Sequence, residues 1–206
     1  MFTVTVVAEN TYLIRGDDSA EALLIDPGGE APTILAQIAE LNVELKAILL
    51  THTHWDHIGA VAEIAKATGA PVYCPVKETE FLLDPKSIFF PDLDFEGYTA
   101  DETVGGGEHL SLAGFEIDVV STPGHSIGHV TYSIPAEDAL FSGDVLFEGS
   151  IGRTDLPGGD HQTLLNSIAG LLETFGDETV VYPGHMGLTQ LGRERATNPF
   201  LQELSK

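Results

Sequence analysis

The chain has 206 residues, with 32 acidic and only 9 basic side chains, which give a formal net charge of -23 at pH 7. Its length and its 43% hydrophobic content suit one globular domain spanning residues 1–206. The charge argues strongly against nucleic acid as a ligand, and no apolar run is long enough to span a membrane. Because the first residues also lack the basic segment of a secretory signal, we expect a cytoplasmic protein.

The acidic residues are scattered along the chain, which is typical of a solvated surface and not of an acidic tail. Two interpretations stay open: an ordinary acidic enzyme, or adaptation to high salt, where screening relieves self-repulsion. A melting temperature no lower in dilute buffer than in molar salt would exclude salt adaptation. The single cysteine, Cys74, excludes an internal disulfide and a Cys-rich zinc site, and we interpret it as a small buried hydrophobe.

The first part of the chain predicts short strands followed by alternating helices and strands. Apolar runs separated by turn residues predict strands at 2–7, 11–15 and 22–25. Apolar residues at helical spacing predict a helix over 31–41, with Pro32 in its first turn, and a strand at 47–50 follows. A second helix begins near Ile58 and ends at Gly69, before a strand at 71–74.

The segment 76–107 is less regular, with a short helix over 77–83, and we expect it to cover the site. Its aromatic residues either line a substrate pocket or, as the favoured interpretation, anchor a long loop to the core: Phe89, Phe90, Phe95 and Tyr98. Strands are then predicted at 110–112, 115–120, 129–134, 139–141 and 180–182. Helices are predicted over 160–175, with Asp160 as N-cap, and over 188–196.

The motif Thr-His-Thr-His-Trp-Asp-His at 51–57 follows directly on the apolar run 47–50. Imidazole nitrogen and carboxylate oxygen suit zinc, iron or manganese. Three further apolar runs also end in a metal-competent residue, since 115–120 leads to His125, 139–141 to Asp144, and 180–182 to His185. Strands that end at one edge of a sandwich deliver such side chains to one cleft, so the four endings predict a single metal site.

The seven candidate ligands divide into a three-nitrogen set, a mixed set and a bridging carboxylate: His52, His54 and His125; Asp56, His57 and His185; and Asp144. We predict catalytic roles for Asp144 and for Asp56, which can accept a proton from the attacking water. A buried polar cluster of this size without metal would be strongly destabilising, which disfavours a purely structural role. The other histidines have no paired spacing and are interpreted as surface or hydrogen-bonded residues: His109, His129 and His161. Of these, His129 is close enough in sequence to His125 to support it.

The motif at 51–57, Thr-Pro-Gly-His at 122–125, Ser-Gly-Asp at 142–144 and Pro-Gly-His at 183–185 together resemble those of the metallo-β-lactamase fold superfamily. Within it the chain is similar to the glyoxalase II branch, because Asp144 supplies the bridging carboxylate and all seven ligand positions are filled. The stretches 149–155 and 191–201 are similar to short bacterial glyoxalase II-like hydrolases. The resemblance implies an α/β protein, a four-layer αββα sandwich with a binuclear site at the sheet edges.

The resemblance also implies hydrolysis of a thioester, S-D-lactoylglutathione or a related hydroxyacyl thiol, with two divalent metal ions. Zinc is the first expectation, and iron or manganese are alternatives. Longer glyoxalase II enzymes carry a C-terminal helical domain with basic residues for glutathione. We expect no such domain here, so the thiol carrier stays open. The candidate anion binders are three arginines: Arg153, Arg193 and Arg195. An equal alternative is that they form ion pairs with nearby acids such as Asp155 and Glu194.

Other functions remain as alternatives. A mononuclear iron dioxygenase of the same fold, acting on glutathione persulfide, would use His52, His125 and Asp144. The stretch 145–150 looks more like the hydrolase branch. A lactonase or β-lactamase comes third, and a non-catalytic module, which would bind metal without turning over any thioester, ester or lactam, comes last.

Overall fold

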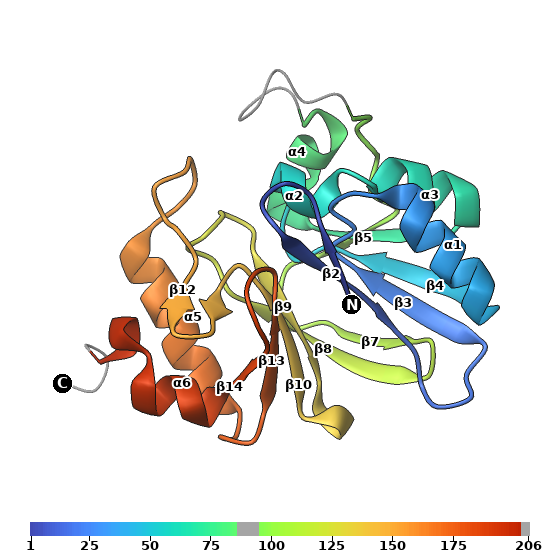
Figure 1. Cartoon of the computed structure of the whole chain (residues 1–206). Coiled ribbons are helices and arrows are strands. Elements are labelled where there is room, and N and C mark those ends of the chain that lie inside the picture. Colours follow the sequence, from blue (N-terminus) through green and yellow to red (C-terminus); the bar gives the residue numbers. More distant parts are fainter. Residues whose placement is uncertain (86–94, 203–206) are drawn as a thin grey trace.

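The computed structural model describes residues 1–85 and 95–202. Two six-stranded sheets face one another, and helices cover the outer face of each (Figure 1). The four-layer αββα sandwich expected from the sequence is therefore confirmed. Within the described residues, no helix is long and apolar enough to cross a membrane.

The first sheet has the order β1-β2-β3-β4-β5-β6 and comes from the first half of the chain. Its strands are β1 (Phe2–Val4), β2 (Glu9–Ile14), β3 (Glu21–Ile25), β4 (Glu44–Leu49), β5 (Val72–Pro75) and β6 (Glu102–Val104). Strands β3 to β6 pair in parallel, so each crossover needs a long connection. Helices α1 (Ala31–Leu41) and α3 (Val61–Thr68) provide two of these crossovers and pack on the outer face.

The second sheet has the order β14-β13-β10-β9-β8-β7. Its strands are β7 (His109–Leu112), β8 (Phe115–Ser121), β9 (Val130–Ile134), β10 (Ala139–Gly143), β13 (Val180–Pro183) and β14 (Thr189–Gln190). Helices α5 (His161–Thr174) and α6 (Leu191–Thr197) cover its outer face. The remaining elements are short: α2 (Trp55–Ile58), η1 (Val76–Glu78), α4 (Thr79–Leu83), η2 (Pro135–Glu137), the hairpin β11 (Leu146–Phe147) and β12 (Ser150–Ile151), and η3 (Pro199–Leu201).

The strands are apolar on both faces because each sheet is covered on both sides. In β3, Leu23 and Ile25 point between the sheets, whereas Ala22 and Leu24 pack under the helices of the first half. This alternation follows from the two-residue period of a strand. Buried Cys74 packs in the outer cluster of the first half as the expected small hydrophobe, and burial raises the pKa of its thiol. The two sheets thus form a rigid base for the residues at their ends.

Three predicted elements differ from the structure for identifiable reasons. The first strand ends at Val4 because Thr5 and Ala8 adopt positive φ angles of 61° and 57° and turn the chain into β2. The last helix begins at Leu191, since residues 189–190 pair with β13 as a strand. The second predicted helix is interrupted between Ile58 and Val61, although it ends before Gly69 as expected.

The aromatic residues of the irregular segment 76–107 can be assigned in part. Phe95 and Tyr98 pack against the outer core of the first half, and the Tyr98 N–H donates to the Leu82 carbonyl at 2.9 Å. These two residues therefore anchor the segment, which was the favoured interpretation. Phe89 and Phe90 lie outside the described residues.

Candidate metal centre

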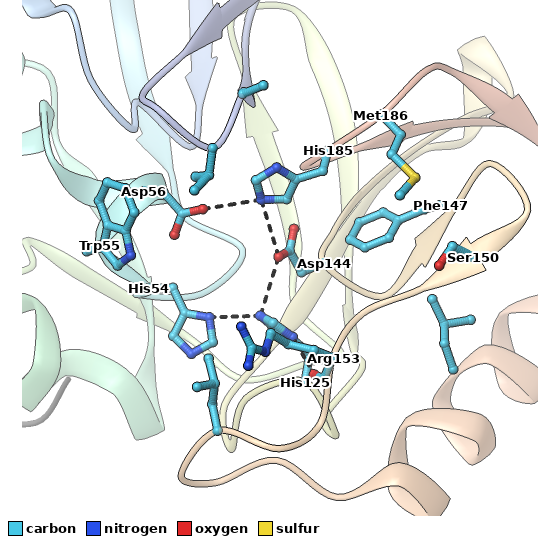
Figure 2. Close-up of a pocket in the computed structure, with 14 residues that line it drawn as sticks. His54, Trp55, Asp56, His125, Asp144, Phe147, Ser150, Arg153, His185 and Met186 are labelled. Carbon is cyan, nitrogen blue, oxygen red and sulfur yellow. Dashed lines mark hydrogen bonds and ion pairs between the residues drawn. The ribbon is translucent and has the colours of Figure 1, made fainter. Parts of the chain in front are cut away.

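The predicted ligands converge at one edge of the sandwich, where β4, β8, β10 and β13 end. Residues 52–57 follow β4, and the loop after β8 carries His125. Asp144 follows β10 directly, and His185 lies two residues beyond β13. Figure 2 shows the side chains of five ligands from both halves pointing toward one another. The structure thus brings together residues that are up to 133 positions apart in the sequence, from His52 to His185.

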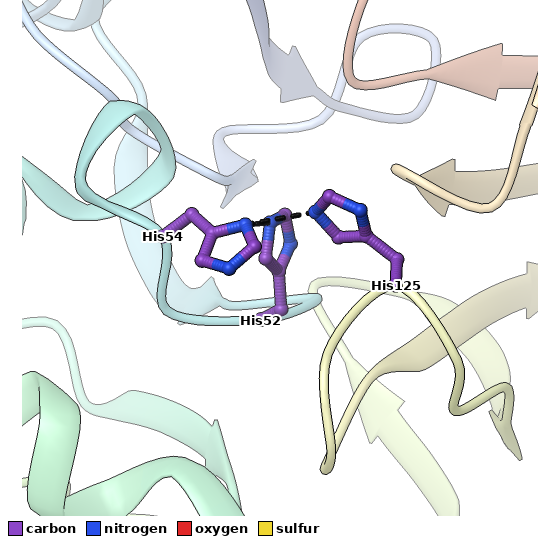
Figure 3. A group of neighbouring side chains, drawn as sticks. All are labelled: His52, His54 and His125. Atoms are coloured by element: carbon purple, nitrogen blue, oxygen red, sulfur yellow. Dashed lines mark hydrogen bonds between the residues drawn. The ribbon is translucent and has the colours of Figure 1, made fainter. Parts of the chain in front are cut away.

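The first ligand set is a compact group of three imidazoles (Figure 3). His54 Nδ1 lies 3.1 Å from His52 Nε2 and 2.8 Å from His125 Nε2, and all three side chains are buried. Burial lowers the pKa of His52 far below its usual value and that of His54 to about 3. Both rings are therefore neutral near pH 7, which is the form that binds a metal ion.

The second set joins Asp56, His57 and His185. Asp56 Oδ2 lies 3.2 Å from His185 Nε2 and 3.9 Å from His57 Nε2. Burial opposes charge on His57, but the nearby carboxylates of Asp144 and Asp56 outweigh it and raise the pKa of the ring. The surroundings of His57 thus favour positive charge, whether this is a proton or a metal ion.

Asp144 lies between the two sets. Its Oδ1 is 3.4 Å from His57 Nε2, and its Oδ2 is 3.5 Å from both His125 Nε2 and His185 Nε2. Burial disfavours the charged carboxylate, but His57 outweighs burial, so the pKa of Asp144 lies well below its usual range. An ionised carboxylate whose Oδ2 faces one histidine of each set has the position expected of a bridging ligand.

The arrangement fits metal ions better than it fits a self-contained hydrogen-bond network. His57 Nε2 and Asp144 Oδ1 are buried and have no hydrogen-bond partner among the described residues, which would be costly without a cation. Tetrahedral zinc with bonds of about 2.0–2.1 Å separates its ligand atoms by roughly 3.3 Å. The contacts of 3.4 Å and 3.5 Å that Asp144 makes are close to that spacing. The buried His and Asp clusters therefore fit a binuclear metal site.

Two hydrogen bonds on the outer side of the ligands fix their orientation. Asp26 faces His57 Nδ1 at 3.0 Å and also accepts from the backbone N–H of Thr51 at 2.7 Å. The Arg153 carbonyl faces His125 Nδ1 at 2.8 Å. Because both acceptors hold the Nδ1 protons, each ring directs its Nε2 atom inward. Asp26 was not among our predicted site residues, although it directly follows β3 and thus matches the strand-end pattern.

His129 supports the centre at His52 and Asp144, whereas we expected its support at His125. Its ring stacks on His52 with centroids 4.9 Å apart, and its Nε2 accepts from the Asp144 backbone N–H at 3.2 Å. Its Nδ1 lies 3.1 Å from Thr122 Oγ1. The ring is fully buried, which lowers its pKa, so a neutral His129 positions the backbone of the bridging carboxylate.

A tight turn at Gly143 brings Asp144 into the centre. The φ angle of Gly143 is +48°, and a Cβ atom there would overlap Thr51 Oγ1 and lie 2.7 Å from His129 Nε2. Only glycine satisfies both the conformation and the space.

Gly143→Ala is expected to destabilise the protein more than Gly114→Ala. Both positions have positive φ, so each alanine costs roughly 1–2 kcal/mol in backbone strain. Only at Gly143 does the new Cβ also collide, because no atom lies within 4 Å of a Cβ at Gly114. Urea unfolding of both metal-free variants measures the difference. Equal losses in unfolding free energy would contradict the close approach at Gly143.

A cleft of about 630 Å³ opens over the centre. Its walls combine five ligands with mainly apolar side chains: Val7, Ala8, His54, Trp55, Asp56, His125, Asp144, Phe147, Ser150, Ile151, Arg153, Leu156, His185 and Met186. The volume is typical of a small-molecule site. None of these residues comes from the described part of 76–107, although Glu78 and Phe81 of that segment line a neighbouring pocket together with His54. A covering role for the segment stays a prediction.

The three candidate arginines have different positions. Arg153 lines the cleft and pairs with Asp155 at 2.7 Å, as the alternative interpretation expected. Arg193 and Arg195 do not line it; they pair instead with Glu148 at 2.7 Å and Asp177 at 2.9 Å. Glu194, the other acid that we considered, is buried and bonded elsewhere. Substrate contact by these arginines stays a prediction.

The αββα fold and its two linked ligand sets together define a metal-dependent hydrolase. Comparison with known proteins gives the family. The model of the metallo-beta-lactamase superfamily matches residues 4–185, and the chain belongs to this superfamily.

Relatives and solved structures match over nearly the whole chain. Hydroxyacylglutathione hydrolase GloC of Haemophilus influenzae is 37% identical over 208 residues, covering 98% of this chain and 97% of the relative. The crystal structure of the BLEG-1 B3 metallo-beta-lactamase has 40% identity and a TM-score of 0.91, with 97% of each chain covered. The structure of TTHA1623 in a di-iron-bound form has 38% identity and a TM-score of 0.87, covering 97% of this chain and 98% of the other.

Proposed function

We propose that the protein is a binuclear metal-dependent hydrolase of a thioester, with S-D-lactoylglutathione or a related hydroxyacyl thiol as substrate. The observation that carries this proposal is the set of acid–base groups at the cleft. Among the described residues that line it, every titratable side chain except Arg153 belongs to the seven ligands. A thiol has a pKa of about 8.5 and leaves as a thiolate, whereas an amine leaving group needs a separate proton donor.

Two divalent metal ions are the proposed cofactors, zinc in first place and iron or manganese as alternatives. Five imidazoles and two carboxylates can bind any of the three. When bound, such ions polarise a carbonyl oxygen and lower the pKa of water. The di-iron-bound structure of TTHA1623 supports the proposed number of ions.

Asp56 is the proposed acceptor of the proton from the attacking water. Burial disfavours its charge, but His57 and the hydrogen bond from His185 outweigh burial, so the pKa of Asp56 lies below its usual value. The side chain lines the cleft and is ionised at neutral pH. A C–O bond forms at the thioester carbonyl carbon, the C–S bond breaks, and the proton passes from Asp56 toward the departing thiolate.

The residues that line the cleft favour a substrate with an acyl group of modest size. Phe147, Ile151 and Met186 provide apolar contacts beside the centre, and Arg153 is the only cation among the described lining residues. The pair that Arg153 makes with exposed Asp155 is screened by solvent, so the guanidinium retains donors for an anionic carrier. We therefore assign the carrier of the thiol to the side of the cleft at Arg153.

The zinc-loaded protein is expected to hydrolyse S-D-lactoylglutathione with a kcat/KM at least about 10²-fold above that for a cephalosporin. This factor is the contribution of a positioned general acid, which the lactam nitrogen would need and the thiolate does not. Release of free thiol and loss of lactam absorbance measure the two reactions.

Hydrolysis of β-lactams is the second candidate, because the name of the structure with the TM-score of 0.91 is that of a metallo-beta-lactamase. An equal or higher kcat/KM for the cephalosporin would overturn the thioester proposal in its favour. Oxidation of a persulfide at one iron is the remaining alternative. That reaction predicts one iron per chain and oxygen uptake with glutathione persulfide, whereas the proposed hydrolase holds two metal ions and consumes no oxygen.

A further inference from the structure

Glu78 is a buried carboxyl group that contacts both of the loops that carry the three-histidine set. Its exposed fraction is only 1%, although it lies in the short helix η1 near the surface of the first half. One loop follows β4 in the first sheet, and the other joins β8 to β9 in the second sheet. Glu78 is not one of the seven predicted ligands.

Each of the two carboxyl oxygens of Glu78 accepts two hydrogen bonds. Oε2 accepts from the backbone N–H of Thr53 at 2.7 Å and from its hydroxyl at 2.9 Å. Oε1 accepts from the Ser126 hydroxyl and from the Gly128 N–H, the latter at 2.9 Å. Thr53 lies between His52 and His54, and Ser126 directly follows His125. Thr53 and Ser126 are thus each adjacent in sequence to a histidine of the three-histidine set, and Gly128 directly precedes His129.

Glycine at position 128 permits this contact. A Cβ atom there would lie 2.6 Å from Glu78 Cγ, so any other residue would push the carboxyl group away from the loop. The loop of the second sheet is therefore built to receive Glu78, as its two donors also indicate.

We propose that Glu78 is a positioning residue that sets the spacing of the three-histidine set by holding its two loops together across the sheets. His54 Nδ1 lies 2.8 Å from His125 Nε2 because loops from different sheets approach at this point. The inference rests on metal-dependent hydrolysis but not on the thioester substrate. It would stand if the substrate proved to be a lactam.

Glutamine cannot replace Glu78 in either orientation of its amide. Each oxygen faces a backbone N–H group, so the amide –NH₂ would oppose a donor that cannot rotate away. Buried Glu194 provides the matched contrast. Its Oε2 accepts from Gly149 N–H at 2.9 Å and from Asn198 Nδ2 at 2.8 Å. Among the described residues its Oε1 faces only the Thr189 hydroxyl, which can also accept. Glu194→Gln therefore keeps all of its bonds in one orientation.

The test compares zinc binding by Glu78→Gln and Glu194→Gln after chelator stripping and reloading. Glu78→Gln is expected to bind one of two zinc ions at least tenfold more weakly. A loss of this size is typical when a residue that orients metal ligands by hydrogen bonds is replaced. Glu194→Gln should match the wild type. With Co²⁺ as the probe, the visible spectrum of the ion left in Glu78→Gln should match that of His54→Ala and differ from that of His185→Ala.

A merely structural role predicts a lower melting temperature of the metal-free Glu78→Gln protein with unchanged affinity for both zinc ions, and that result would overturn the proposal. Ser126→Ala removes only one of the four hydrogen bonds and serves if Glu78→Gln does not fold. This variant should bind the same zinc ion more weakly than the wild type does. Wild-type zinc affinity in folded Ser126→Ala would count against the proposal as well.

Discussion

Asp144→Asn is expected to lower the kcat of hydrolysis on the order of 10³-fold or more. The substitution keeps the volume of the side chain but removes the charge that lies 3.4–3.5 Å from His57, His125 and His185. These histidines belong to both ligand sets, so neither set retains its shared carboxylate. Loss of one preorganised electrostatic group in an active site commonly costs 10²- to 10³-fold, about 3–4 kcal/mol, and here the loss extends to metal binding.

Thioester hydrolysis and metal content should be measured on the same preparation of the Asp144 variant. Asp118→Asn is the matched control, because Asp118 is an exposed carboxylate that pairs with His109 at 2.7 Å, on strand β8. Its activity should equal that of the wild type. A kcat within tenfold of the wild type in Asp144→Asn would refute the bridging role of Asp144.

His54→Ala is expected to lose one of two metal equivalents and to reduce hydrolysis at least about 10²-fold. His54 Nδ1 is the atom that lies within 3.1 Å of both other nitrogens of its set, so its removal leaves two ligands for the first ion. The second set, Asp56, His57 and His185, is unchanged and should retain its metal. Metal analysis of the purified variant measures the loss directly.

The exposed residue His161 at the start of α5 provides the control for this experiment. His161→Ala should keep both metal equivalents and full activity. Unchanged activity in His54→Ala would disprove the binuclear role assigned to the three-histidine set.

The position of the site could be predicted because it depends on a local pattern. In each case an apolar run is followed by a residue that can bind metal, and strands of one sandwich that run in the same direction end at the same edge. That pattern located His125, Asp144 and His185 far from the motif at 51–57. Applied to the strand before Asp26, it would also have found the partner of His57.

Glu78 could not be found in this way. It lies in the helical turn η1 three residues beyond β5 and has no neighbouring histidine, and its four hydrogen bonds reach residues 25, 48 and 50 positions away. Such contacts depend on how the two sheets pack, which no period in the sequence encodes. The early end of β1 was missed for a related reason, since Thr5 and Ala8 adopt positive φ without the glycine or asparagine that normally marks such a turn.

The acyl and thiol groups of the substrate are less well defined by the sequence than the metal ligands. Apart from Trp55 and Leu156, the apolar walls of the cleft come from the β1–β2 turn, the β11–β12 hairpin and the residue after His185, which share no motif. Arg153 is at the cleft because the loop after β12 also provides the carbonyl that faces His125. Substrate choice is therefore a property of the assembled surface, whereas the chemistry follows from the ligands.

Titration of the metal-free wild-type protein with Zn²⁺, while hydrolysis of S-D-lactoylglutathione is followed, tests the central claim most directly. We predict that activity rises until two equivalents of zinc are bound per chain and then stays constant. Full activity at one equivalent, or binding of two equivalents without release of thiol, would contradict a binuclear thioester hydrolase.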